Sequence, residues 1–274
     1  MFIEILKTIV YGIVEGITEW LPISSTGHLI LLNDIMPMNV SKEFWKMFLV
    51  VIQLGAIIAV IVHFWDKIFP FNTKVKEKSF IRYSVMNMWV KIIVSCLPAA
   101  VIGILYDDWV DAHLYNSLVV SIMLILVGIA FIVVEVLNRS KKPRITSIRE
   151  ISYIDALIIG CFQVVSAVLP GTSRSGATII GGLIIGIDRK TSAEFTFFLA
   201  IPVMLGASLL KLVKFGFHFT FTEITILLMG MVVAFLVSIL VIRFLMSYIK
   251  KHDFKVFGYY RIVLGIVVLA YFFI

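Results

Sequence analysis

Long apolar blocks separated by short polar loops dominate the pattern of this sequence. Ten blocks can be distinguished, at roughly residues 3–21, 24–36, 44–65, 88–106, 115–137, 153–169, 173–187, 192–210, 224–246 and 256–274. Most of them approach the roughly 20 residues that a helix needs to cross a hydrocarbon core of roughly 30 Å. The pattern predicts an all-α integral membrane protein with a single membrane domain at 1–274.

Two of the blocks, 24–36 and 173–187, are short, and each follows a polar stretch that contains a proline. These stretches read Leu21-Pro22-Ile23-Ser24-Ser25 and Leu169-Pro170-Gly171-Thr172-Ser173. Proline ends the helix before it, and Ser or Thr can cap the helix that follows. We therefore expect a helix-break-helix hairpin at each place, which leaves six other blocks to span the membrane.

The second half of the chain resembles the first. A shift of 148 residues places Gly12 on Gly160, Leu21 on Leu169, Pro22 on Pro170 and Ser25 on Ser173, while Glu15 meets Gln163 and Ser24 meets Thr172. A shift of 151 places Glu43-Phe44 on Glu194-Phe195 and Leu54-Gly55-Ala56 on Leu205-Gly206-Ala207. Two matches in the same order indicate a duplication, with repeats at 1–137 and 151–274.

The loop charges predict how the repeats are oriented. Segments 66–91, 138–150, 188–190 and 243–255 hold 17 of the 24 Lys and Arg residues. If both hairpins are re-entrant and the other six blocks cross, all of these loops fall on one side, which the positive-inside rule makes cytoplasmic. The repeats are then inverted, with the first hairpin entering from outside and the second from the cytoplasm. Broken helices at membrane depth need polar surroundings, so the two breaks should meet around a buried polar cavity.

Composition excludes several other classes of protein. Hydrophobic residues make up 61% of the chain and charged residues only 15%, and the mean hydropathy is +1.05. Soluble, fibrous and disordered chains do not have this composition. The net charge of +7 comes from Lys and Arg in the loops, where they anchor a protein to anionic lipid, so no nucleic-acid partner is expected.

Two carboxylates precede the first break. Glu15 and Glu19 are four residues apart, which places both on one face of a helix. A charge at membrane depth costs at least about 2.5–3.5 kcal/mol, so the pair implies a cation, a shared proton or access to water. Mg²⁺ or Ca²⁺ is the favoured neutraliser because both prefer carboxylate and phosphate oxygens. The alternative is a shallow segment with both carboxylates solvated.

The first break also offers a nucleophile and a base. Ser24, Ser25 and Thr26 lie within one turn of His28, whose imidazole could accept a hydroxyl proton near neutral pH. Ordinary capping of the following helix by Ser24 explains these residues equally well.

The second break has the features of an anion cradle. It reads Pro170-Gly171-Thr172-Ser173-Arg174-Ser175-Gly176-Ala177-Thr178. Amides at a helix start attract phosphate, and Arg binds phosphate oxygens with two parallel hydrogen bonds. A simple cap with Arg174 reaching to the surface is the weaker alternative, because a cation is unfavourable in the first turn of a helix.

Other polar and aromatic residues receive structural interpretations. Gln53 and Glu194 lie inside apolar blocks and either line the cavity or form hydrogen bonds between helices. The tryptophans lie near block ends, as interfacial aromatics do; they are Trp20, Trp45, Trp65, Trp89 and Trp109.

The motifs at the two breaks closely resemble those of the undecaprenyl-diphosphatase, or bacitracin-resistance, family. They are Glu15-Gly16-Ile17-Thr18-Glu19-Trp20-Leu21-Pro22-Ile23-Ser24-Ser25-Thr26-Gly27-His28 and Pro170 to Thr178. Their order and separation, the number of spans and the duplicated halves agree along the whole chain. The resemblance implies a metal-dependent enzyme of the bacterial inner membrane. Such an enzyme hydrolyses the terminal phosphate of undecaprenyl diphosphate, regenerates the lipid carrier for peptidoglycan synthesis and confers bacitracin resistance. Its site is expected to open to the outer, periplasmic side.

Carried onto this chain, the resemblance implies roles for individual residues. Glu15 and Glu19 would hold a divalent cation, Mg²⁺ or Ca²⁺, and Arg174 would bind phosphate oxygens. Ser25, or else Ser24, would attack the terminal phosphorus with His28 as base, or His28 would activate water directly. The remaining candidates for phosphate binding are Ser24, Ser173, Ser175 and Thr178.

Alternatives from other classes stay open. A secondary transporter or flippase of a lipid phosphate or anion also uses inverted repeats that meet at broken helices. An acid-phosphatase-type lipid phosphatase would need a His six residues after Arg174, where this chain has Ile180. The expected partners are a polyprenyl diphosphate lipid and the membrane, and the sequence leaves a homodimer open.

Overall fold

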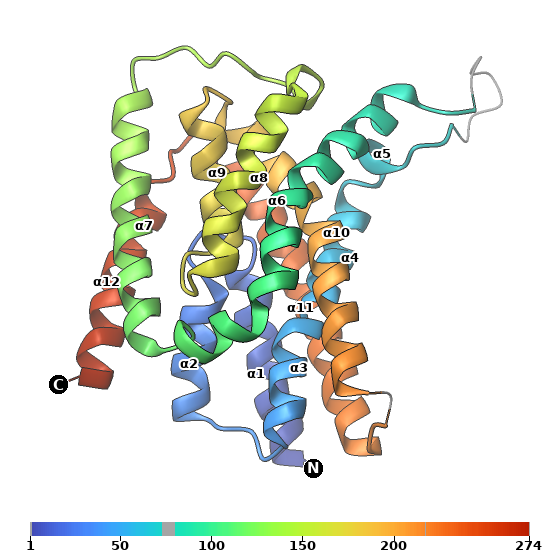
Figure 1. Ribbon diagram of the computed structural model, residues 1–274, viewed down its shortest axis with the longest axis vertical. Helices are drawn as coiled ribbons and strands as arrows, with labels where there is room; N and C mark the ends of the chain where they lie inside the picture. Colours follow the sequence, from blue (N-terminus) through green and yellow to red (C-terminus); the bar gives the residue numbers. More distant parts are fainter. Residues whose placement is uncertain (1, 73–79, 217, 274) are drawn as a thin grey trace.

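The computed structural model describes residues 2–72, 80–216 and 218–273, and these ranges are predominantly helical (Figure 1). The helices are α1 (Phe2–Thr18), α2 (Ser25–Ile35), α3 (Lys42–Val51), α4 (Gln53–His63), α5 (Trp65–Ile68), α6 (Tyr83–His113), α7 (Ser117–Asn138), a 3₁₀ turn η1 (Ile148–Glu150), α8 (Tyr153–Val168), α9 (Arg174–Ile184), α10 (Arg189–Phe215), α11 (Phe221–Tyr248) and α12 (Lys255–Phe273). The described residues add only isolated β-bridges, so the prediction of an all-α fold is confirmed.

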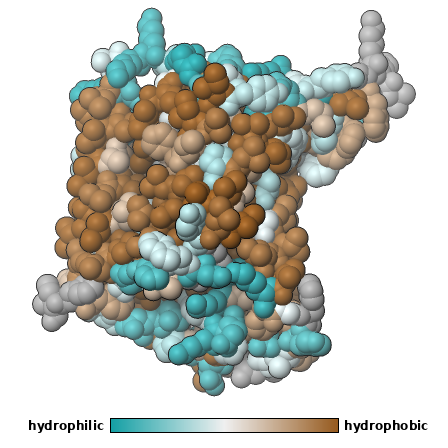
Figure 2. Space-filling model, in the orientation of Figure 1, coloured by the Kyte–Doolittle hydropathy of each residue, from teal (hydrophilic) through white to brown (hydrophobic). Residues whose placement is uncertain are grey.

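The described residues contain six helical segments long and apolar enough to cross a membrane. They are Lys42–His63, Tyr83–Tyr106, Ser117–Asn138, Arg189–Phe215, Phe221–Tyr248 and Lys255–Phe272. They correspond to the six blocks that the sequence assigns to spans. Figure 2 shows a wide apolar belt on the visible face, with polar residues gathered at both ends. The protein is therefore a multi-pass membrane protein.

Four shorter helices form two pairs. The chain breaks at residues 19–24 between α1 and α2, and again at residues 169–173 between α8 and α9. In Figure 1 the α1–α2 pair occupies the lower half of the molecule and the α8–α9 pair the upper half. Both breaks lie near mid-height, which brings the two polar stretches to the same depth.

Glycines allow the first helix of each pair to pack closely on a long helix. At Gly12 of α1, an added Cβ would lie 2.8 Å from the Val233 side chain and 3.0 Å from the Gly230 carbonyl oxygen of α11. At Gly160 of α8, it would lie 2.3 Å from the Ser95 carbonyl oxygen of α6. No larger residue fits at such distances. The matched pair Gly12 and Gly160 therefore serves the same packing purpose in both halves.

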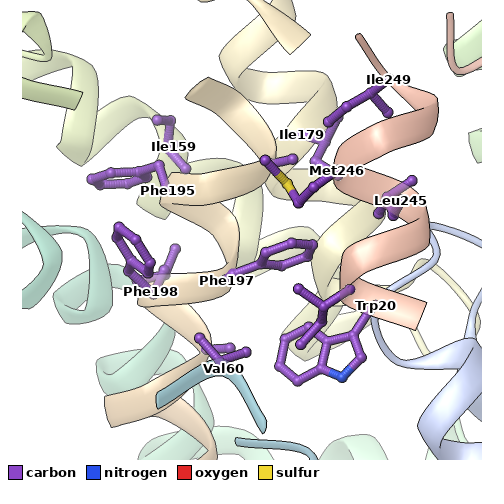
Figure 3. Packing of buried hydrophobic residues seen from close by; sticks show 14 of the residues in the cluster. Trp20, Val60, Ile159, Ile179, Phe195, Phe197, Phe198, Leu245, Met246 and Ile249 are labelled. Carbon is purple, nitrogen blue, oxygen red and sulfur yellow. The ribbon is translucent and has the colours of Figure 1, made fainter. Parts of the chain in front are cut away.

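The interpretation of Trp20 as an interfacial residue is wrong. Trp20 is fully buried and packs edge-to-face on Phe197 of α10, with ring centroids 5.2 Å apart (Figure 3). It belongs to the first break, which lies inside the protein, so its ring joins the main hydrophobic cluster instead of meeting headgroups. Trp65 and Trp109, by contrast, are about half exposed, at 49% and 51%.

Two further expectations are settled by local structure. The polar stretch between the apolar blocks 88–106 and 115–137, expected as a loop, is largely helical, because α6 continues to His113. Glu194 of α10 accepts a 2.8 Å hydrogen bond from Lys67 of α5, as expected for a hydrogen bond between helices. Of the basic segment 66–91, residues 73–79 lie outside the described residues.

Candidate active site

Both breaks end in the same unusual backbone conformation. Ser24, directly before α2, has φ of 73°, and Ser173, directly before α9, has φ of 70°. Within the described residues these are the only non-glycine residues with positive φ. Such a conformation costs on the order of 1–3 kcal/mol and persists where the surroundings impose it, commonly at functional sites.

This conformation corrects the predicted register of the repeat by one residue. The shift of 148 pairs Ser25 with Ser173, whereas the backbone pairs Ser24 with Ser173, a shift of 149. The second break accommodates one more residue between its proline and its cap, and Gly171 there has φ of 90°. The same shift of 149 aligns Gly27 with Gly176.

An ion pair joins the two breaks. Arg174 Nη2 donates to Glu19 Oε1 at 3.0 Å, although the two residues are 155 positions apart. Glu19 is 6% exposed, and its other oxygen accepts from Ser25 Oγ at 3.0 Å. Ser175 Oγ donates to the backbone oxygen of Glu19 at 3.1 Å. The structure thus brings Glu19, Ser25, Arg174 and Ser175 together.

The hydroxyls of the second break are largely bonded to one another and to the backbone. Ser173 Oγ caps α9 by accepting from Gly176 N at 3.2 Å, and it lies 3.1 Å from Ser175 Oγ. Thr178 Oγ1 donates to the Arg174 carbonyl at 2.9 Å. Among the described residues, no acceptor pairs with the backbone N–H groups of Ser173, Arg174 and Ser175. The amides at the start of α9 therefore remain available to an anion.

Ser25 and His28 have different partners. His28 Nδ1 lies 2.7 Å from the Ser24 carbonyl, which can only accept, so Nδ1 carries a hydrogen. His28 Nε2 lies 2.7 Å from the hydroxyl of Tyr260, and the two rings stack with centroids 5.6 Å apart. Ser25 is bonded to Glu19. Ser25 and His28, the nucleophile and base that the sequence suggests, are therefore not hydrogen-bonded to each other in this structure.

Several buried polar groups around the breaks have no partner within the described residues. Glu15 is 0% exposed and neither of its carboxylate oxygens is bonded. Gln163, which the repeat matches to Glu15, is equally unpaired, as are the hydroxyls of Ser24 and Thr172. Buried polar atoms normally have partners, so these groups are suited to bind water, a cation or a substrate.

The donor set fits a hard divalent cation. Within the described residues, no three or more His, Cys, Asp and Glu side chains are placed together to hold a metal ion. Mg²⁺ is commonly held by one or two carboxylates together with substrate phosphates. The two unpaired oxygens of Glu15, with Glu19 one turn further, match that pattern.

Helix α12 contributes two residues to which the sequence analysis assigned no role. Tyr260 bonds His28, and the guanidinium of Arg261 donates to carbonyl oxygens of both breaks. Arg261 is fully buried. A signal was present, since an ionisable residue inside an apolar span is by default a functional candidate.

Comparison with known proteins gives a consistent result. The model of a family described as "Bacitracin resistance protein BacA" matches residues 8–267. An "Undecaprenyl-diphosphatase" of Enterococcus faecalis is 60% identical over 268 residues, covering 98% of this chain and 97% of the relative. An "Undecaprenyl-diphosphatase 1" of Clostridium acetobutylicum is 61% identical, covering 99% of this chain and 98% of the relative. A Desulfitobacterium hafniense "Undecaprenyl-diphosphatase" is 58% identical, with coverage of 98% and 96%.

Proposed function

Because this chain belongs to the family of the bacitracin resistance protein BacA, we propose that its two breaks form the active site of an undecaprenyl-diphosphatase. The protein is a membrane-embedded hydrolase that removes the terminal phosphate of undecaprenyl diphosphate and regenerates the monophosphate lipid carrier. The observation that carries the assignment of the site is the Glu19–Arg174 ion pair, which joins the acidic break to the basic one.

The second break binds the diphosphate. Arg174 offers a planar fork of donors, and the free amides at Ser173 to Ser175 add hydrogen bonds at a helix start. In this structure Glu19 and the carbonyl of Thr196 accept from Arg174, both at 3.0 Å. Phosphate oxygens are the same kind of acceptor, so the diphosphate can replace Glu19 as a hydrogen-bond partner of the Arg174 guanidinium.

The first break carries out the substitution at phosphorus. Ser25 Oγ attacks the terminal phosphorus, the bond to the bridging oxygen breaks, and undecaprenyl phosphate leaves. Water then cleaves the bond between Ser25 and phosphorus, which releases inorganic phosphate and restores the hydroxyl. Glu19 already accepts the hydroxyl hydrogen of Ser25, which makes it better placed than His28 to take that proton. Direct attack by water near His28 is the competing route.

A divalent cation, Mg²⁺ or Ca²⁺, would be held by Glu15 and Glu19. Its chemical contribution would be to neutralise charge on the diphosphate oxygens. The two unpaired, fully buried oxygens of Glu15 support this assignment.

The enzyme resides in the bacterial inner membrane as two inverted repeats, 1–137 and 151–274, with re-entrant hairpins that enter from opposite sides. The pairing of α1 with α11 and of α8 with α6 through glycines supports the repeat. The positions of the two hairpins in Figure 1 support their opposite entry. We place the opening of the site on the periplasmic side, at the end where the α1–α2 hairpin lies, because the Lys- and Arg-rich loop at residues 139–149 lies at the opposite end of the molecule in Figure 1.

Phosphate release from undecaprenyl diphosphate by detergent-purified protein tests the mechanism. A phosphoserine trapped at position 25, with turnover lost in Ser25→Ala, supports covalent catalysis. Retained turnover in Ser25→Ala supports direct water attack. Movement of labelled lipid across vesicles without hydrolysis would contradict the enzyme and favour a transporter.

The orientation is tested separately with an impermeant thiol reagent in a variant that lacks Cys96 and Cys161. The reagent should label Lys42→Cys in intact cells and Lys142→Cys only after the membrane is opened. The reverse pattern contradicts the periplasmic site.

A further inference from the structure

Arg261 is the only fully buried arginine among the described residues, and unlike Arg144, Arg174 and Arg189 it has no carboxylate partner. Arg144 pairs with Asp155, Arg174 with Glu19 and Arg189 with Glu135. Arg261 is 0% exposed, and no described carboxylate lies within ion-pair distance of it. A buried charge without an opposite charge is strongly unfavourable, so its presence requires an explanation.

The guanidinium of Arg261 is held by carbonyl oxygens of both breaks. Nη2 donates to Gly171 O at 2.8 Å and to Thr172 O at 2.9 Å in the second break. Nη1 donates to Pro22 O at 3.2 Å in the first break. A single side chain from α12 thus ties together two segments that lie about 150 positions apart in the chain. These carbonyls satisfy the donors but do not neutralise the charge.

These contacts determine which way the neighbouring amides point. In a trans peptide the N–H is directed opposite to the C=O. Because the Thr172 carbonyl faces Arg261, the N–H of Ser173 faces away from it, and that N–H is among the unpaired amides at the start of α9. The guanidinium lies beside the first turn of α9, since a Cβ added at Gly176 would lie 3.5 Å from Arg261 Nη1.

The distribution of charge around the two breaks also points to Arg261. Glu15 and Glu19 provide two negative groups, while Arg174 and Arg261 provide two positive groups. Arg174 is matched directly by Glu19, whereas no described carboxylate pairs with Arg261, so an anion bound between the breaks would supply a counter-charge for Arg261. Diphosphate is the anion that the proposed function brings to this place.

We propose that Arg261 is a positioning residue for the diphosphate: it holds the carbonyls of both breaks so that the α9 amides face the substrate, and it adds positive charge behind them. The inference rests on the proposed function. Arg261 itself makes no contact with phosphate, because its Nη atoms already donate to backbone carbonyl oxygens.

The test compares Arg261→Lys with Arg189→Lys. The second variant is a matched control, because it loses the hydrogen bonds of a guanidinium to the Glu135 carboxylate, which lies away from the breaks. The measurements are thermal stability in detergent, hydrolysis of undecaprenyl diphosphate, and inhibition by inorganic pyrophosphate and by inorganic phosphate. In Arg261→Lys the inhibition constant for pyrophosphate should rise about tenfold, because an ammonium cannot hold the carbonyls of both breaks and the α9 amides are then less well oriented, with a smaller rise for phosphate. In Arg189→Lys, stability should fall while both inhibition constants stay at the wild-type values.

An unchanged pyrophosphate constant in Arg261→Lys, or an equal rise in Arg189→Lys, would overturn the proposal. Wild-type hydrolysis in the same preparation separates this result from failure of the proposed function. If Arg261→Lys does not fold, hydrogen exchange on the wild-type protein provides the answer. Pyrophosphate should protect the amides of Ser173 to Ser175 from exchange, and unaltered exchange there contradicts the proposed amide orientation.

Discussion

The two breaks share a backbone conformation but differ in how their polar groups are satisfied. At the second break, Ser173 caps α9, and the hydroxyls of Ser173, Ser175 and Thr178 are bonded, while that of Thr172 is not. At the first break, Ser24 makes no cap hydrogen bond, and the carboxylate of Glu15 has no partner in the described chain. The second break therefore has most of its hydroxyls bonded, whereas the first leaves the Ser24 hydroxyl and the Glu15 carboxylate without a partner in the described chain.

The helices that follow the two breaks, α2 and α9, differ in how deeply they are buried. Every residue of α9 from Ser175 to Leu183 is buried, while in α2 only Gly27 and Leu29 are. A helix buried on all sides holds its N-terminal amides in place, and a helix with an open face lets a substrate reach Ser25 and His28. The comparison suggests that the second break binds and the first break reacts.

The largest effect is expected from Glu19→Gln, because Glu19 links the two breaks. The substitution removes the charge that pairs with Arg174 and weakens the acceptor of Ser25. We expect kcat to fall by on the order of 10³ or more, the magnitude of losing a central electrostatic group. Phosphate release measures it, and Glu223→Gln, which keeps a capping oxygen in α11, is the control. A kcat within threefold of wild type would remove Glu19 from the chemistry.

Arg174→Lys probes the binding break. The guanidinium donates through two nitrogens, to Glu19 and to the carbonyl of Thr196, and an ammonium cannot reproduce that fork. A loss of about 10² to 10³ in kcat/KM is expected. Arg139→Lys, at an exposed position, serves as the control and should be neutral. Near wild-type kcat/KM in Arg174→Lys would mean that phosphate binds elsewhere.

Removal of divalent ions tests the free carboxylate of the first break. Chelation should abolish turnover, and added Mg²⁺ or Ca²⁺ should restore it. In Glu15→Gln, the concentration of Mg²⁺ for half-maximal activity should rise about tenfold, because one anionic ligand is lost. A titration of activity against Mg²⁺ in both proteins measures this. If chelator leaves the wild-type rate unchanged, Glu15 has another role.

Much of the fold followed from patterns local in sequence. The apolar blocks predicted the six candidate spans, and the prolines predicted both breaks, because span length and helix termination are decided within one segment. The two breaks were expected to meet because broken helices at membrane depth need polar surroundings, and the Glu19–Arg174 ion pair joins them.

The parts that sequence reasoning missed depend on contacts between distant segments. His28 meets Tyr260 across 232 positions, and Arg261 meets Pro22 across 239. No local pattern specifies which face of α12 turns toward the breaks. Trp20 was wrongly assigned to the membrane interface because it lies near the end of an apolar block, and the sequence does not reveal that this block ends inside the protein.

The smallest effect is expected from Tyr260→Phe, which tests whether His28 belongs to the reacting side. The substitution removes one hydroxyl bonded to His28 Nε2 and leaves the stacked ring in place. One such hydrogen bond is worth about 0.5–1.5 kcal/mol, so kcat should fall about twofold to tenfold with thermal stability little changed. The adjacent, exposed Tyr259→Phe is the matched control. If His28→Ala abolishes turnover while Tyr260→Phe does not alter kcat, the substrate displaces the Tyr260 hydroxyl before the reaction, and His28 acts alone.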